Sequence, residues 1–258
     1  MTKNTLTTDI VCHKLARLKT PALAECFREL VSTPRHQNLT LLEAMDMMAD
    51  RELESRDLKR QERYLQRSGL RDLAVWNQAD ESKGIYSAER NLSKRDVSRL
   101  MTCEWIRAGH NVMINGATGT GKTWLLAVLG KQVCMSGFPV LYMRYAQMLE
   151  KLSDARAHNE TATLRHQWNR HSLLIIDDFG SSSISQDLAS DLLTLLEERE
   201  GVSSIAIASQ LPFNAWHERL GKGLNADAIM DRLINTSYEF SLSGNSLRER
   251  PDVNGLEM

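Results

Sequence analysis

A strand, a glycine-rich loop and a helix are predicted in immediate succession within residues 111–126, NVMINGATGTGKTWLL. The apolar run before the loop has the length of a buried strand, and the longer apolar run after it has a helical length and pattern. The loop itself, residues 116–123, fits the spacing GxxxxGK[ST]. Glycines at these positions let backbone N–H groups turn inward around an anion, and the helix N-terminus adds a partial positive charge. This segment therefore predicts a strand–loop–helix unit with a phosphate site at its turn.

Short apolar runs alternate with helical patterns throughout the second half of the chain. The runs that resemble buried strands are residues 111–115, 139–143, 173–177, 205–209 and 238–242. Helical patterns separate them, including residues 122–135 and 187–199. Strands that alternate with helices form right-handed crossovers and a parallel sheet that is covered on both faces. We therefore predict an α/β fold with a five-stranded parallel sheet between helices.

The first half of the chain has a different character. Of the 14 glycines, only Gly69 and Gly84 occur before residue 109. Apolar residues there recur at helical spacing, interrupted by Pro21, and Thr40 with Glu43 resembles a capping box. We predict three parts: a small all-α domain at 1–76, a linker at 77–98 and the α/β domain at 99–258.

Composition limits the class of protein. Apolar residues make up 42% of the chain and charged residues 25%, which is typical of soluble globular proteins. The longest apolar run, residues 124–129, is far too short to cross a membrane, and the N-terminal stretch has no apolar signal core. The four cysteines are scattered, as expected for reduced thiols. We expect a cytoplasmic protein with no membrane partner.

A second motif places acidic residues beside the phosphate loop. In LLIIDDFG, residues 173–180, four apolar residues precede Asp177 and Asp178 at the end of a predicted buried strand. The C-terminal ends of parallel strands share one edge of the sheet, so this pair lies near the loop. Paired carboxylates are seldom structural there, because burying them unpaired costs on the order of several kcal/mol. We assign Asp177 to binding Mg²⁺ through water, and Asp178 to orienting or activating the attacking water.

Together the two motifs predict binding of ATP with Mg²⁺ and its hydrolysis. Lys122 would reach the β- and γ-phosphates, and the Thr123 hydroxyl would ligate Mg²⁺. The expected nucleotide contacts are Gly116, Ala117, Thr118, Gly119, Thr120, Gly121, Lys122, Thr123 and Trp124. The NKxD motif of GTPases does not occur in the sequence, and LSGNS at residues 242–246 follows the acidic strand, whereas the signature of ABC transporters precedes it.

The chain resembles the IstB family of transposition helper ATPases, which are related to the helicase loader DnaC within the AAA+ class. The resemblance covers nearly the whole chain. It rests on LARLKTPALAE, CEWIRAGHNVMINGATGTGKT, LLIIDDFG, SQLPFNAWHERL and ADAIMDRL, in that order. It implies a P-loop AAA+ core after the helical domain, and Mg²⁺-dependent hydrolysis of ATP to ADP and phosphate.

The resemblance also assigns roles near the nucleotide. Ser209 and Gln210 follow the fourth strand, where a sensor 1 residue would touch the γ-phosphate or its water, and we assign this role to Ser209. Either residue could instead cap the following helix. Arg232 in IMDRL matches an arginine finger, donated to the nucleotide of a neighbouring subunit. Its alternative is an ordinary surface arginine paired with Asp227 or Asp231.

Two positions near the nucleotide depart from the pattern or match it weakly. Many AAA+ ATPases have Glu where this chain has Asp178, and the shorter side chain could slow hydrolysis. Arg248 lies near the place of a sensor 2 arginine, although the family is truncated there.

The resemblance further implies a homo-oligomer assembled with ATP and DNA, double-stranded DNA bound without sequence preference, and a cognate transposase. Basic residues within 51–71 are one candidate DNA surface, and the insert at 144–170 is the other. The insert contributes Lys151, Arg156, Arg165 and Arg170. Each could instead be a solvated charge, and residues 51–71 a helix face with pairs such as Glu52 and Arg56. The absence of a base-reading motif fits backbone binding.

Two other functions remain open. The first is a replicative helicase loader of the DnaC type, in which ATP gates release of a ring helicase. The second is a DNA-binding protein whose nucleotide is only structural. CEWIRAGHNV and SQLPFNAWHERL resemble IstB more than DnaC, so we prefer a helper ATPase that assembles on target DNA and recruits or activates a transposase.

Overall fold

The computed structural model describes residues 7–34, 38–70 and 90–247 of the 258-residue chain. The chain divides into two compact units, Met1–Glu62 and Arg63–Met258. The division falls inside one long helix, α3 (Leu41–Arg67). Of the linker expected at 77–98, residues 77–89 lie outside the described residues, and its last residues begin helix α4 (Lys94–Met101). The expected domain boundaries stay a prediction.

The first unit is helical, as the sequence predicts. It contains α1 (Thr8–Arg17), α2 (Pro21–Ser32) and most of α3. Pro21 begins α2, because the first helical position needs no amide hydrogen. The predicted capping box also forms: Thr40 N donates to Glu43 Oε2 at 2.8 Å, and Glu43 N donates to Thr40 Oγ1 at 3.3 Å.

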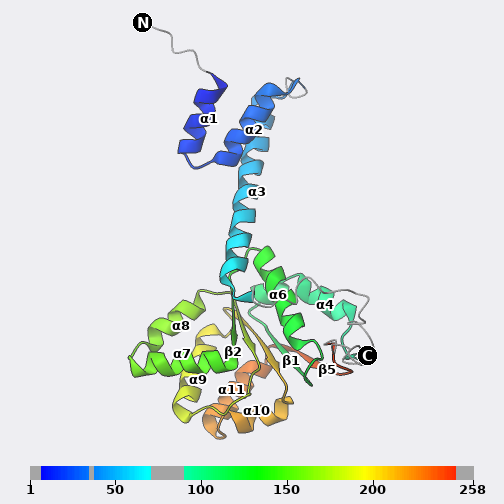
Figure 1. Ribbon diagram of the computed structural model, residues 1–258, viewed down its shortest axis with the longest axis vertical. Helices are drawn as coiled ribbons and strands as arrows, with labels where there is room; N and C mark the ends of the chain where they lie inside the picture. The colour runs from blue at the N-terminus through cyan, green and yellow to red at the C-terminus, as the bar shows by residue number, and fades with distance from the viewer. Residues whose placement is uncertain (1–6, 35–37, 71–89, 248–258) are drawn as a thin grey trace, which may run out of the picture. The chain divides into compact units, whose positions relative to one another are not determined.

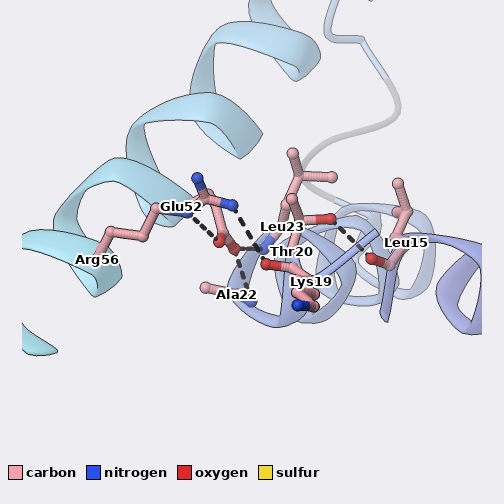
Figure 2. A network of polar contacts seen from close by, with 7 residues as sticks. All are labelled: Leu15, Lys19, Thr20, Ala22, Leu23, Glu52 and Arg56. Carbon is pink, nitrogen blue, oxygen red and sulfur yellow. Dashed lines mark hydrogen bonds and ion pairs between the residues drawn. The ribbon is translucent and has the colours of Figure 1, made fainter. Parts of the chain in front are cut away.

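A buried carboxylate of α3 caps the start of α2 (Figure 2). Glu52 Oε2 accepts hydrogen bonds from the amides of Ala22 and Leu23 at 3.0 and 3.1 Å, which have no acceptor within their own helix. Arg56 Nε donates to Glu52 Oε1 at 2.8 Å, and its guanidinium also donates to Lys19 O at 3.2 Å. Burial alone would raise the pKa of Glu52, but these hydrogen bonds and the charge of Arg56 hold it below its ordinary value.

The second unit is built on a parallel sheet of five strands in the order β2-β3-β4-β1-β5 (Figure 1). Every neighbouring pair is parallel. The strands are β1 (Asn111–Gly116), β2 (Val140–Arg144), β3 (Leu173–Asp177), β4 (Ser204–Ser209) and β5 (Ser237–Leu242). The predicted α/β fold with five parallel strands is therefore confirmed.

Helices cover both faces of this sheet (Figure 1). After α4, they are α5 (Glu104–Arg107), α6 (Lys122–Met135), α7 (Tyr145–Ala157), α8 (Thr161–Asn169), α9 (Gln186–Arg199), α10 (Phe213–Arg219) and α11 (Leu224–Ile234). Val112 and Ile114 of β1 join a core with α4 and α6, while Met113 between them joins a second core with α9 and α11. This alternation is the two-residue period of a strand. Of the helices that the structure describes, none is both long enough and apolar enough to span a bilayer.

The buried side chain of Arg199 connects the ends of α8 and α9 to the start of β4. Arg199, at the end of α9, is almost completely buried, and its guanidinium donates to three carbonyl groups. These belong to Trp168 at 3.2 Å, His171 at 3.0 Å and Ser204 at 2.8 Å. Burial lowers the pKa of Arg199 to about 10, so the side chain remains charged at neutral pH. The end of α8 and the start of β4 are thereby held to the same group.

Replacing Glu52 by Gln tests the capping network. The amide keeps an acceptor oxygen but loses the charge that strengthens the bonds to the α2 amides. We expect amide exchange in residues 21–32, measured by mass spectrometry on the full chain, to accelerate about fivefold, equivalent to about 1 kcal/mol. Because the pKa of Glu52 is lowered, its contribution is complete above about pH 4.3 and disappears as the pH falls through the lowered value.

The matched control is Glu54→Gln, an exposed carboxylate of the same helix. It should leave exchange in residues 21–32 unchanged, and the difference between wild type and Glu52→Gln should shrink at acid pH. Equal acceleration in both variants would show that charge on α3, and not the cap, protects α2.

Candidate nucleotide site

The glycine-rich loop connects β1 to α6 at the C-terminal edge of the sheet. Gly116 has a φ of +150° and Gly121 a φ of +102°, a region that favours glycine. A Cβ atom at Gly116 would also overlap the carbonyl oxygen of Leu242. The backbone therefore takes a path that requires glycine at both positions, as a phosphate-binding loop does.

Lys122 lies across this loop. Its Nζ donates to Gly116 O at 2.7 Å and to Ala117 O at 2.8 Å, and the residue is buried. The ammonium group therefore already occupies the turn that the motif assigns to the phosphates. Thr120, also buried, closes the turn by donating from Oγ1 to Ala117 O at 2.9 Å.

Two further observations concern the residues that are expected to contact the nucleotide. The carbonyl oxygen of Gly119 accepts a hydrogen bond from Leu247 N at 2.8 Å, so the chain after β5 lies against the loop. The Trp124 side chain is buried in the core beneath α6. A nucleotide contact by Trp124 is thus restricted to its backbone at the start of the helix.

The second motif meets the first at Asp177, which is almost completely buried. Its Oδ2 accepts hydrogen bonds from Thr123 Oγ1 at 2.8 Å and from the Tyr142 hydroxyl at 3.1 Å. Its Oδ1 accepts from Asp178 N at 2.9 Å. The structure therefore brings together Thr123 and Asp177, the two residues that the sequence assigned to Mg²⁺.

These residues fit an ATP–Mg²⁺ complex. A hydroxyl and a carboxylate are the hard oxygen donors that Mg²⁺ takes from proteins, and it draws its other ligands from water and phosphate. Asp178 is only partly buried and has a φ of +55°. Among the described residues, its carboxylate has no hydrogen-bond or ion-pair partner, which leaves it available to a water molecule.

The structure separates the two sensor candidates. Ser209 is fully buried, and its Oγ donates to Phe179 O at 2.7 Å and accepts from Leu211 N at 3.1 Å. Its single hydrogen therefore serves a carbonyl group within the fold. Exposed Gln210 instead accepts a hydrogen bond at Oε1 from Thr118 Oγ1 at 2.8 Å. The sensor role of Ser209 stays a prediction, and of the two candidates it is Gln210 that contacts the phosphate loop.

Arg232 lies near the N-terminal ends of the strands, whereas the glycine-rich loop lies at their C-terminal ends. It belongs to α11, and its carbonyl oxygen accepts a hydrogen bond from Asn111 Nδ2 at 3.4 Å, at the start of β1. The loop follows the other end of that six-residue strand, a distance of about 17 Å. The Arg232 side chain therefore does not reach the loop of its own chain.

The guanidinium of Arg232 pairs with two carboxylates. Glu197 Oε1 lies 2.9 Å from its Nη2, and Glu200 Oε2 lies 3.5 Å from its Nε. The alternative to an arginine finger was a surface arginine paired with Asp227 or Asp231. These aspartates instead contact His217 at 2.9 Å and Asn235 at 2.8 Å.

A known family matches nearly the whole chain. A family model described as IstB-like ATP binding protein matches residues 13–254. The insertion-sequence ATP-binding protein y4pL of Sinorhizobium fredii is 35% identical over 235 residues, which are 91% of this chain and 94% of that protein. The chain belongs to the IstB-like ATP-binding protein family.

Two solved structures share the fold of this IstB-like protein. The replication initiator DnaA, bound to AMPPCP and single-stranded DNA, aligns with a TM-score of 0.51 and 18% identity over 62% of this chain and 48% of that one. The DnaC helicase loader aligns with a TM-score of 0.50 and 13% identity over 58% and 87%. At such identities the likeness shows the fold alone, which is the AAA+ P-loop core.

The cations of the IstB-like insert fall into two groups. Arg156 pairs with Asp187 at 3.2 Å and with Asp191 at 3.0 Å, both on α9. Arg165 pairs with Glu198 at 3.0 Å. Lys151 and Arg170 are exposed, and neither forms an ion pair within the part of the chain that the structure describes.

The basic stretch at 51–71 is likewise divided. The expected pair of Arg56 with Glu52 forms at 2.8 Å, Arg51 lies 3.6 Å from Glu29, and Arg60 lies 2.8 Å from Asp57. The basic residues Lys59, Arg63 and Arg67 are exposed on α3. Arg71, and the sensor 2 candidate Arg248, lie outside the described residues.

Tyr142 is the site residue that sequence analysis missed. It lies within a short apolar run, where a tyrosine is an ordinary strand residue. The signal that could have found it is the pairing of β2 with β3. In that pairing Arg144 lies opposite Asp177, and Tyr142 lies two residues before Arg144. That register is known only once the strands are paired.

Asp178→Asn tests the chemistry of the acidic pair. Asparagine tolerates the positive φ as aspartate does and keeps the shape, but it loses the charge that would activate water. We expect phosphate release at saturating ATP to fall at least about 100-fold, while affinity for a fluorescent ATP analogue is unchanged. Asp187→Asn, an exposed acid of α9, should hydrolyse ATP normally. Wild-type hydrolysis by Asp178→Asn would show that Asp178 does not activate water.

Proposed function

We propose that this protein is the ATP-dependent DNA-binding helper ATPase of an insertion sequence. In the bacterial cytoplasm it would assemble on target DNA and recruit or activate the partner transposase. Membership of the family supports the insertion-sequence context, since its relatives are named as insertion-sequence ATP-binding proteins. The observation that supports the proposal is the position of Arg232 at the end of the strands opposite the loop, because an arginine finger there would act on the nucleotide of another copy.

In each copy, the loop would bind the phosphates of ATP through its backbone, and Lys122 would turn from the loop carbonyl groups to the β- and γ-phosphates. Thr123 would hold Mg²⁺ directly and Asp177 would hold it through water. Bound there, Mg²⁺ would neutralise charge that develops on the phosphates. Asp178 would orient the attacking water and accept its proton, and Gln210 would contact the γ-phosphate or that water.

A second copy would complete this site. In a head-to-tail assembly, the loop edge of one subunit faces the opposite edge of the next. Arg232 would then leave Glu197 and Glu200 for the γ-phosphate of its neighbour. Both glutamates are about half exposed, so little burial opposes this exchange. Hydrolysis would therefore report on assembly.

DNA would be bound through its phosphates by several subunits together. The whole chain has a net charge of −1, so one copy carries no net positive charge that would attract DNA. Exposed cations lie on α3 and, as Lys151 and Arg170, in the insert, and each group would serve as a small basic patch. An assembly would repeat these patches along the duplex, and the gain would come from multivalency.

Mixing two inactive variants tests the shared site. Arg232→Ala should bind ATP but lose about 10³-fold in hydrolysis, the scale of an arginine finger. Lys122→Ala should fail to bind ATP yet keep its Arg232. A mixture of the two should recover part of the activity, because one supplies the loop and the other the arginine. Lys222→Ala, a surface cation paired with Glu218, is the control. A mixture no more active than either variant would contradict the shared site.

DNA binding tests the function itself. Affinity for random duplexes, measured by fluorescence anisotropy across a salt series, should rise sharply with a non-hydrolysable ATP analogue. Neutralising Lys59, Arg63 and Arg67 together should weaken binding and reduce the salt slope by about 0.9 for each DNA phosphate that the protein no longer neutralises. Arg51→Ala, which removes a cation already paired with Glu29, is the matched control. Equal affinity with and without the analogue would contradict the proposal and leave a helicase loader as the better account.

A further inference from the structure

The carboxylate of Asp177 accepts hydrogen bonds from three residues. The Asp178 amide holds Oδ1, while the hydroxyl groups of Thr123 and Tyr142 both donate to Oδ2. A threonine hydroxyl can donate its hydrogen to Asp177 and still offer a lone pair to a cation. The phenol of Tyr142 comes from β2 and is separate from the phosphate loop. Its hydroxyl therefore contacts the carboxylate from outside the phosphate loop.

The backbone of Tyr142 is held in place by the residues that follow α3. Its strand lies at the edge of the sheet, where Tyr142 N donates to Ser68 O at 2.7 Å. Gly69 follows with a φ of +78°, and a Cβ there would lie 3.0 Å from Tyr142 O. Leu70 is fully buried in the core beside α6. The chain that leaves α3 thus packs tightly on the backbone of Tyr142, which fixes the backbone from which the hydroxyl reaches Asp177.

We propose that Tyr142 is a positioning residue for the metal carboxylate: its hydroxyl sets the orientation of Asp177 and thereby the affinity for the divalent cation of bound ATP. The inference rests on the proposed function, in which Thr123 and Asp177 hold that cation. Partners that orient metal-binding groups in this way commonly change affinity by about 10- to 100-fold when they are removed.

Tyr142→Phe isolates the hydroxyl. The phenyl ring keeps the packing of β2, while Oδ2 of Asp177 loses one of its two donors. In the full chain with a non-hydrolysable ATP analogue, Mn²⁺ affinity measured by electron paramagnetic resonance should fall about tenfold. Affinity for the analogue in EDTA should stay at the wild-type value. The Mg²⁺ concentration for half-maximal hydrolysis should rise by the same factor, and saturating Mg²⁺ should restore the maximal rate.

Tyr145→Phe is the matched control. Tyr145 lies three residues further on and is fully buried, and within the described residues its hydroxyl has no hydrogen-bond partner. Removing that hydroxyl should leave Mn²⁺ affinity unchanged. Equal weakening in both variants, or wild-type affinity in Tyr142→Phe, would overturn the proposal. A lower maximal rate without a change in the Mg²⁺ requirement would also overturn it.

Two more variants separate this inference from the function on which it rests. Thr123→Val and Asp177→Asn should each remove the protein's own contribution to Mn²⁺ binding. Mn²⁺ should then bind only as tightly as it does to the free analogue. If both retain that contribution, the cation lies elsewhere and the metal assignment fails. If both lose it while Tyr142→Phe binds Mn²⁺ as wild type does, only the role of Tyr142 fails.

Discussion

The hydrogen bond from the Thr123 hydroxyl to Asp177 joins the two halves of the nucleotide site. Thr123 follows β1 and Asp177 ends β3, and β4 lies between these strands in the sheet. The contact therefore forms only if three parallel strands end at the same edge in the observed order. A buried carboxylate also needs donors, and Thr123, Tyr142 and the Asp178 amide supply them. Sheet order, loop path and metal site thus depend on one another.

The same sheet gives each subunit two chemically different edges. The residues assigned to the nucleotide lie at the C-terminal ends of the strands. Arg232 lies near the start of β1, with Glu197 and Glu200 as its partners. A parallel sheet has this polarity because all its strands run the same way. In the proposed assembly, each subunit would present a loop that lacks an arginine finger and, at the other end of its strands, an arginine that is distant from its own loop. Under that proposal, head-to-tail association is the arrangement that would use both groups.

Charge on the surface is more balanced than the basic residue count of either candidate segment indicates. Arg156 and Arg165 of the insert pair with acids of α9, and Arg51, Arg56 and Arg60 pair within the first unit. The exposed pairs among them, Arg51 with Glu29 and Arg60 with Asp57, contribute little to stability, about 0–1 kcal/mol each. They nevertheless lower the positive potential that a single copy presents to phosphates. Affinity for DNA is therefore expected from repetition of small patches, not from one basic face.

Local pattern alone determined much of this protein. The strands and helices follow from apolar periodicity, the phosphate loop from its glycine spacing, and the capping box of Thr40 and Glu43 from two residues. Tertiary structure decided the contacts between residues far apart in the chain. It turned Ser209 toward Phe179 and Gln210 toward Thr118, gave Arg232 glutamate partners, and brought Tyr142 to Asp177. The reason is geometric: at the end of a strand, neighbouring side chains point in different directions, and only the order and register of the strands decide what each one meets.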